Sequence, residues 1–118
     1  VAGAMIPKLF APASLEAPHP SVETTTELIA AANPAAIAAA QRGMAARPDE
    51  TSLIPSIDLP IAAIVGEHDA LTPPAEAEAI AAAAPDATAT MIPGAGHMAP
   101  VENPAAVADA LRALLNRL

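Results

Sequence analysis

Residues 61–66 read IAAIVG and residues 87–93 read ATATMIP, with an Ala- and Glu-rich stretch between them. A short apolar run that ends in glycine is typical of a strand buried on both faces, as in a parallel sheet. The intervening stretch is predicted to be a helix that opens at Thr72–Pro73 and continues to about Ala84. Two strands joined by one helix should be parallel, with a right-handed crossover.

Proline residues mark most of the other boundaries. Asn103–Pro104 opens an amphipathic last helix, because Asn is a favoured N-cap and Pro a favoured first helical residue. Upstream, two helices are predicted over residues 22–32 and from Pro34 to about Ala46. Residues 1–20 are predicted to be mostly irregular, and residues 49–60 to be a connector. The predicted fold class is therefore α/β: two helices, a linker and a βαβα unit with parallel strands.

The composition excludes several classes of function. The 118 residues carry 13 Asp and Glu against five Lys and Arg, so the chain lacks the basic surface that nucleic acids require. No apolar run approaches the roughly 18 residues of a membrane helix, and the acidic charge disfavours anionic lipid surfaces. The absence of cysteine removes thiol catalysis and thiolate metal sites. The 34 alanines bury little area each, so a thin core is predicted.

Asp69 and His97 are the candidates for acid–base chemistry, since each follows a predicted strand, in GEHD and in PGAGH. The carboxyl ends of adjacent parallel strands lie at one edge of a sheet, so the two loops can meet. An Asp that accepts from one imidazole nitrogen leaves the other nitrogen available as a general base. Two alternatives stay open: Asp69 capping the Thr72 helix, and His97 as a solvated loop residue.

The sequence has one further histidine near these loops, and it has a set of possible metal donors. His68 adjoins Asp69 but is predicted to point elsewhere, as a surface residue. The potential metal donors are Glu67, His68, Asp69, His97 and Glu102. Their spacing matches no metal-ligand motif, and neither a metal nor a cofactor is expected.

From about Pro60 to Leu118 the sequence resembles the C-terminal part of α/β-hydrolase fold enzymes. The resemblance is carried by Gly66 and Asp69, the Thr72–Pro73–Pro74 helix start, the Pro93–Gly94–Ala95–Gly96–His97 turn and Glu102–Asn103–Pro104. Residues 1–56 look like the end of the lid helices and their return to the core. The resemblance thus implies a lid-derived helical segment, 1–56, and a C-terminal βαβα part of the hydrolase core, 57–118. It is with the subgroup that includes 3-oxoadipate enol-lactonases and small carboxylesterases.

This resemblance implies cleavage of an ester, lactone or related acyl bond by a Ser-His-Asp triad, with Asp69 as the orienting acid and His97 as the general base. The family's G-x-S-x-G nucleophile elbow is not in this sequence. We therefore expect this chain to be the C-terminal portion of a cytoplasmic hydrolase that acts on a small-molecule acyl substrate. No nucleic-acid or membrane partner is expected. The alternative is an inactive chain or interaction module that needs an N-terminal half and self-associates through an exposed strand edge.

Overall fold

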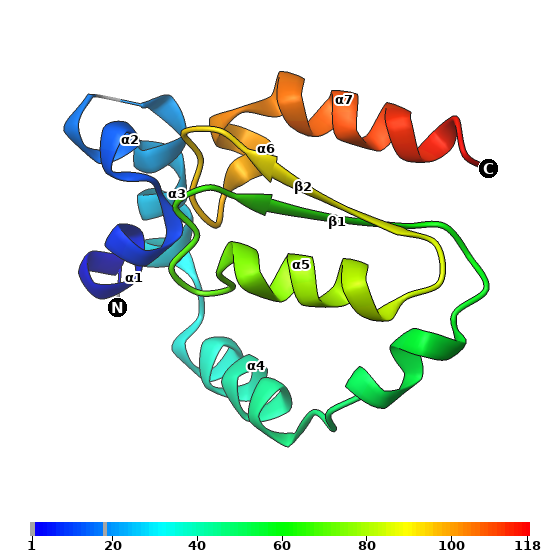
Figure 1. Cartoon of the computed structure of the whole chain (residues 1–118). Helices are drawn as coiled ribbons and strands as arrows, with labels where there is room; N and C mark the ends of the chain where they lie inside the picture. Colours follow the sequence, from blue (N-terminus) through cyan, green and yellow to red (C-terminus); the bar gives the residue numbers. More distant parts are fainter. Residues whose placement is uncertain (1, 18) are drawn as a thin grey trace.

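The computed structural model describes residues 2–17 and 19–118, which form a two-stranded parallel sheet with helices on both faces (Figure 1). Strand β1 (Ile61–Gly66) pairs with β2 (Ala87–Ile92), from Ile61 opposite Ala87 to Gly66 opposite Ile92. Helix α5 (Pro74–Ala83) covers one face of the sheet, and α7 (Pro104–Leu115) covers the other. Because the register is level, both strands end at the same edge.

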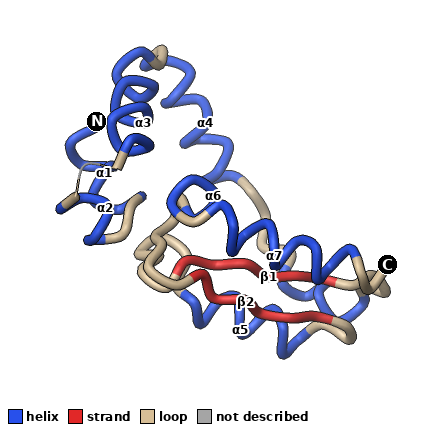
Figure 2. Tube along the Cα trace, turned by 90° about the horizontal axis from the view of Figure 1, so that it is seen from above, coloured by secondary structure: helices blue, strands red, loops and turns tan. Residues whose placement is uncertain are grey.

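In the described part of the chain, the sheet is preceded by four α-helices and one 3-10 helix: α1 (Ala2–Leu9), α2 (Pro12–Glu16), α3 (Pro20–Ala31), α4 (Pro34–Ala46) and η1 (Thr51–Ser56). Helices α1, α2 and α3 lie beyond the carboxyl ends of the strands, and both views show this arrangement (Figures 1 and 2). The N-terminal segment therefore lies beside the loops that carry the candidate residues.

The prediction of mostly irregular structure over residues 1–20 is wrong, because α1 and α2 lie there; Val1 and Pro18 are outside the described residues. Pro7 lies inside α1, whereas Pro12 and Pro20 stand at the first helical positions of α2 and α3. A proline costs little there, since the N–H that it lacks would have no helical partner. Between β2 and α7 the chain also forms a short helix, α6 (Ala99–Glu102).

The predicted helices α3, α4, α5 and α7 and both strands are confirmed. Asn33 Oδ1 accepts a hydrogen bond from the Ala35 amide at 2.8 Å at the start of α4. Asn103 does the same for α7, where its Oδ1 lies 3.3 Å from the Ala106 amide. These contacts satisfy backbone donors that a helix leaves open at its N-terminus, which is why Asn-Pro marks both starts.

The core is thin, as predicted. Its largest fully buried side chain is Ile92, which packs with the buried residues Ala95 and Ala99. The apolar stripe of the last helix is largely uncovered, because Leu115 is 64% exposed and Leu118 is 78% exposed. The helical spacing of its apolar residues thus identifies the apolar face of α7, although this chain covers only part of that face.

Arg117 ties the C-terminus to the beginning of both strands. Its guanidinium donates to the Ile61 carbonyl at 3.3 Å, to the Asp86 carbonyl at 3.1 Å and to the Asp86 carboxylate. We expect Arg117→Ala to lower the free energy of unfolding in urea by about 1–2 kcal/mol, since charge-assisted hydrogen bonds are lost. Arg112→Ala is the control, because it removes only an exposed pair within α7 and should cost at most about 0.5 kcal/mol. Equal midpoints for the two variants would refute this role.

Candidate active site

Backbone contacts continue the pairing of the strands into the loops that follow them. The Glu67 amide donates to the Ile92 carbonyl at 3.0 Å, and the His68 amide donates to the Ala95 carbonyl at 2.8 Å. Gly94 has φ +68°, a conformation that glycine adopts without a Cβ penalty, and its amide donates to Glu67 Oε2 at 2.8 Å. The loops after β1 and β2 are therefore fixed against each other.

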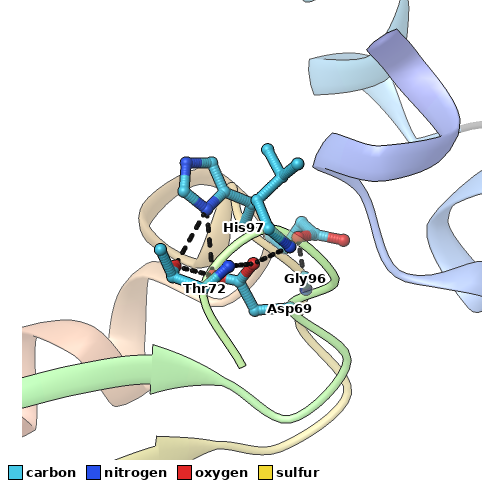
Figure 3. A network of polar contacts seen from close by, with 6 residues as sticks. Asp69, Thr72, Gly96 and His97 are labelled. Carbon is cyan, nitrogen blue, oxygen red and sulfur yellow. Dashed lines mark hydrogen bonds and ion pairs between the residues drawn. The ribbon is translucent and has the colours of Figure 1, made fainter. Parts of the chain in front are cut away.

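These loops bring the two candidate side chains together. His97 Nδ1 lies 2.9 Å from Asp69 Oδ2, and Figure 3 shows the ring above the Asp69 carboxylate and the Thr72 hydroxyl. Thr72 Oγ1 donates to the same Oδ2 at 2.8 Å and lies 3.4 Å from His97 Nδ1. Three polar side chains from the two loops thus form one connected network.

The Asp69 carboxylate is buried, with a side chain only 5% exposed, and both of its oxygens are hydrogen-bonded. Its Oδ1 accepts from the Leu71 and Thr72 amides, each at 2.9 Å. Burial by itself raises the pKa of Asp69, but hydrogen bonds from Thr72, His97 and Leu71 outweigh it and hold that pKa below its ordinary value. Asp69 is therefore an ionised acceptor at neutral pH.

An ionised carboxylate can only accept, so its contact with His97 requires the proton to be on Nδ1. In the neutral ring, Nε2 then keeps its lone pair. The His97 side chain is 37% exposed, which leaves the ring accessible from outside the loops. This arrangement can take up a proton at Nε2 and stabilise the resulting imidazolium through Asp69.

The hydrogen bonds of Asp69 predict that the folded chain loses stability at acidic pH. Because the pKa of Asp69 is lower in the folded chain than in the unfolded chain, the unfolded state binds more protons between the two values. Stability should therefore fall as the pH decreases below about 4, the ordinary aspartate range. We expect Asp69→Asn to flatten the pH dependence of the unfolding free energy between about pH 5 and pH 3. Asp58→Asn, at an exposed connector position, should keep the wild-type slope. A wild-type slope in the Asp69 variant would contradict the prediction.

The second histidine near these loops, His68, lies apart from this network. His68 is on the surface, 3.8 Å from the Glu67 carboxylate. Asp69 accepts from the Leu71 and Thr72 amides, which precede α5, and no side chain of the described residues caps the first turn of that helix. The alternative in which Asp69 caps the helix is therefore wrong. In residues 2–17 and 19–118, no group of three or more His, Asp or Glu side chains is arranged to hold a metal ion. Among the same residues, no helix has the length and apolar character to cross a membrane.

Two residues, Thr72 and Glu102, were not recognised from the sequence as parts of the site. Thr72 was recognised only as a helix start, although its spacing of three from Asp69 is a pattern in which Asp accepts from backbone and hydroxyl groups. Glu102 was recognised only as part of a motif and as an unlikely metal donor. Its contacts with Ala11 and Ser14 span most of the chain, and no local pattern indicates them.

Some known proteins are similar to this chain in sequence or in architecture. The sequence profile of the Alpha/beta hydrolase family matches residues 2–110. A thermophilic esterase from Thermogutta terrifontis, solved with malate bound, is 40% identical with a TM-score of 0.90; the match covers 98% of this chain and 43% of the esterase. A protein described as a non-heme bromoperoxidase from Mycobacterium tuberculosis H37Rv shares the fold at 22% identity and a TM-score of 0.67, with 98% and 44% covered. The comparison with curated proteins gave no match.

The chain thus spans less than half the length of these two solved structures. The family profile nevertheless matches nearly the whole chain, and the identity with the esterase extends over almost all of it. The partial fold, two parallel strands with helices on both faces, has its counterpart in that esterase. The chain belongs to the α/β-hydrolase family.

Proposed function

We propose that this chain is the C-terminal portion of an α/β-hydrolase that cleaves an ester, lactone or related acyl bond. In this proposal Asp69 orients His97, and His97 is the general base for a serine that lies outside the 118 residues. Residues 1–56 are the lid-derived segment, and residues 57–118 are part of the catalytic core. The enzyme is cytoplasmic and acts on a small-molecule substrate.

The observation that carries the proposal is the 2.9 Å contact between Asp69 Oδ2 and His97 Nδ1, at the carboxyl edge of a parallel sheet. His97 Nε2 takes the hydroxyl proton while the serine oxygen bonds to the acyl carbon, and the pair stabilises the imidazolium. The same nitrogen then returns the proton to the departing alkoxide, so the leaving group departs as an alcohol. The order Asp before His matches the order Ser, Asp, His of this family.

An apolar groove supports an acyl substrate with a hydrocarbon part. It has a volume of about 340 Å³, opens between α1, α3 and α4, and its lining includes Met5, Leu9, Leu28 and Ile37. The Leu9 carbonyl accepts a hydrogen bond from the Met98 amide at 2.9 Å, so the wall of the groove adjoins the residue after His97. A volume of this size suits a small ligand. Lactones and open-chain esters both satisfy these requirements.

A second candidate is an inactive chain or interaction module that needs a complementary N-terminal half. It is favoured by the uncovered apolar residues, including Leu28 at 66% and Leu59 at 68% exposed, and by the two edges of the small sheet. Unpaired strand edges favour pairing with another chain, so self-association through an edge is expected of the isolated protein. Size-exclusion chromatography with light scattering tests this, since a strictly monomeric chain would argue against it.

Hydrolysis of short-chain p-nitrophenyl esters separates the two candidates. We expect the 118-residue chain alone to show no hydrolysis above background, because a serine elbow is absent from it. The complete reading frame that encodes it should encode G-x-S-x-G upstream and should hydrolyse the esters. A complete reading frame without such a serine, or without hydrolysis, would refute the proposed function. Hydrolysis by the isolated chain that His97→Ala abolishes would show that a nucleophile is inside these residues.

A further inference from the structure

One carboxylate joins the N-terminal segment to the loop that carries His97. Glu102, at the end of α6, accepts from the Gly96 amide at 2.7 Å through Oε2. Its other oxygen, Oε1, accepts from the Ala11 amide and from the Ser14 hydroxyl, each at 2.8 Å. Gly96 immediately precedes His97, so this carboxylate fixes the backbone next to the ring and holds a segment about ninety residues away in sequence.

The N-terminal segment is pressed closely against this loop. Phe10 is 2% exposed and Ala11 is 0% exposed, although both belong to a short connection between helices. A Cβ added to Gly96 would lie 2.7 Å from the Ala11 amide nitrogen and 2.8 Å from the Phe10 carbonyl carbon. The Met98 amide donates to the Leu9 carbonyl at 2.9 Å. Both sequence neighbours of His97 are therefore anchored to residues 9–14.

We propose that Glu102 is a positioning residue that sets the orientation of the His97 ring toward Asp69 by holding residues 9–14 against the His97 loop. The consequence for catalysis rests on the proposed function, whereas the consequence for the ring concerns the Asp69–His97 contact itself. The segment that enters the helical lid thereby acts on the general base. The packing of residues 9–14 against the loop and the orientation of His97 are thus coupled, with the Glu102 carboxylate as the side chain that joins them.

Three donors converge on Glu102, and only a carboxylate satisfies all three, because both of its oxygens accept. The amide of a glutamine has the same shape but offers one accepting oxygen and one NH2 group. That NH2 would face a backbone N–H, either of Gly96 or of Ala11, and leave a partly buried donor without an acceptor. Glu102→Gln therefore breaks one side of the connection while keeping the side-chain volume.

The test is the imidazole NMR spectrum of the 15N-labelled 118-residue chain, recorded at mildly alkaline pH. In the wild type, His97, assigned with His97→Gln, should show a single tautomer with the proton on Nδ1. Glu102→Gln should replace this pattern with averaged nitrogen shifts and move the Gly96 or Ala11 amide signal. Glu78→Gln, on the exposed side of α5, is the matched control and should leave the ring unchanged.

A purely structural role for Glu102 predicts lower stability without a change at the ring. An unchanged His97 tautomer in Glu102→Gln, despite a shifted Gly96 or Ala11 amide, would overturn the proposal. If that variant does not fold, Ser14→Ala provides the second test, because it removes one donor and should move the ring signals less, in the same direction. Unmoved signals there would also overturn it. Lack of esterase activity in the complete reading frame would refute the proposed function and leave these ring measurements standing.

Discussion

His97→Ala should lower kcat for ester hydrolysis by about 10⁵–10⁶-fold in the complete hydrolase that we propose. The reason is the geometry at the sheet edge: the ring is held by Asp69 at 2.9 Å and is 37% exposed on its outer side. An alanine removes the proton acceptor and the cation that the buried carboxylate stabilises. Substrate binding should change much less, so the loss appears in kcat and only weakly in KM.

Asp69→Asn should cost about 10⁴-fold in kcat, although the variant side chain is nearly isosteric. An asparagine can donate its NH2 to Nδ1, which favours the tautomer with the proton on the wrong nitrogen. His68→Ala is the matched control, since this exposed neighbour contacts only Glu67 in the described network and should stay within about twofold of wild-type kcat. Comparable losses in the His68 and His97 variants would rule out the assignment of the general base.

The sequence could predict the meeting of Asp69 and His97 because two local patterns suffice for it. An apolar run that ends in glycine marks β1, and a level parallel register then brings the residues after both strands to one edge. The two Asn-Pro helix starts could also be predicted, since each Asn side chain accepts from an amide in the first helical turn. Such features depend on residues within a few positions of each other.

What the sequence could not predict depends on contacts between distant segments. Helices α1 and α2 have only eight and five residues, and Pro7 lies inside α1, so the local sequence does not indicate a helix there and neighbouring segments decide the conformation. The Glu102 carboxylate meets Ala11 only after the chain has folded back on itself. Periodicity likewise marks the apolar face of α7 without indicating what covers Leu115. Packing partners are a property of the whole fold, and a one-dimensional pattern contains them only indirectly.

The close approach at the end of β1 predicts the largest effect on stability. Gly66 is buried, and a Cβ there would lie 2.5 Å from the Ala95 carbonyl oxygen, 2.8 Å from its carbon and against the Gly96 carbonyl. These are backbone atoms of the His97 loop, which is fixed by the His68 amide on Ala95. They cannot move aside as a flexible side chain would. Gly66→Ala should therefore cost at least about 3 kcal/mol, the upper end of what overpacking costs.

Urea denaturation followed by circular dichroism measures this loss, and the chain contains its own control. Gly43 lies in the exposed helix α4, and a Cβ there meets nothing within 4 Å. Gly43→Ala should raise the free energy of unfolding by up to about 1 kcal/mol, because alanine has the better helix propensity. The same substitution thus changes sign between two positions, since at Gly66 space decides and at Gly43 backbone entropy decides. A Gly66 variant with the wild-type midpoint would show that the His97 loop can move. It would then contradict a rigid placement of the His97 ring.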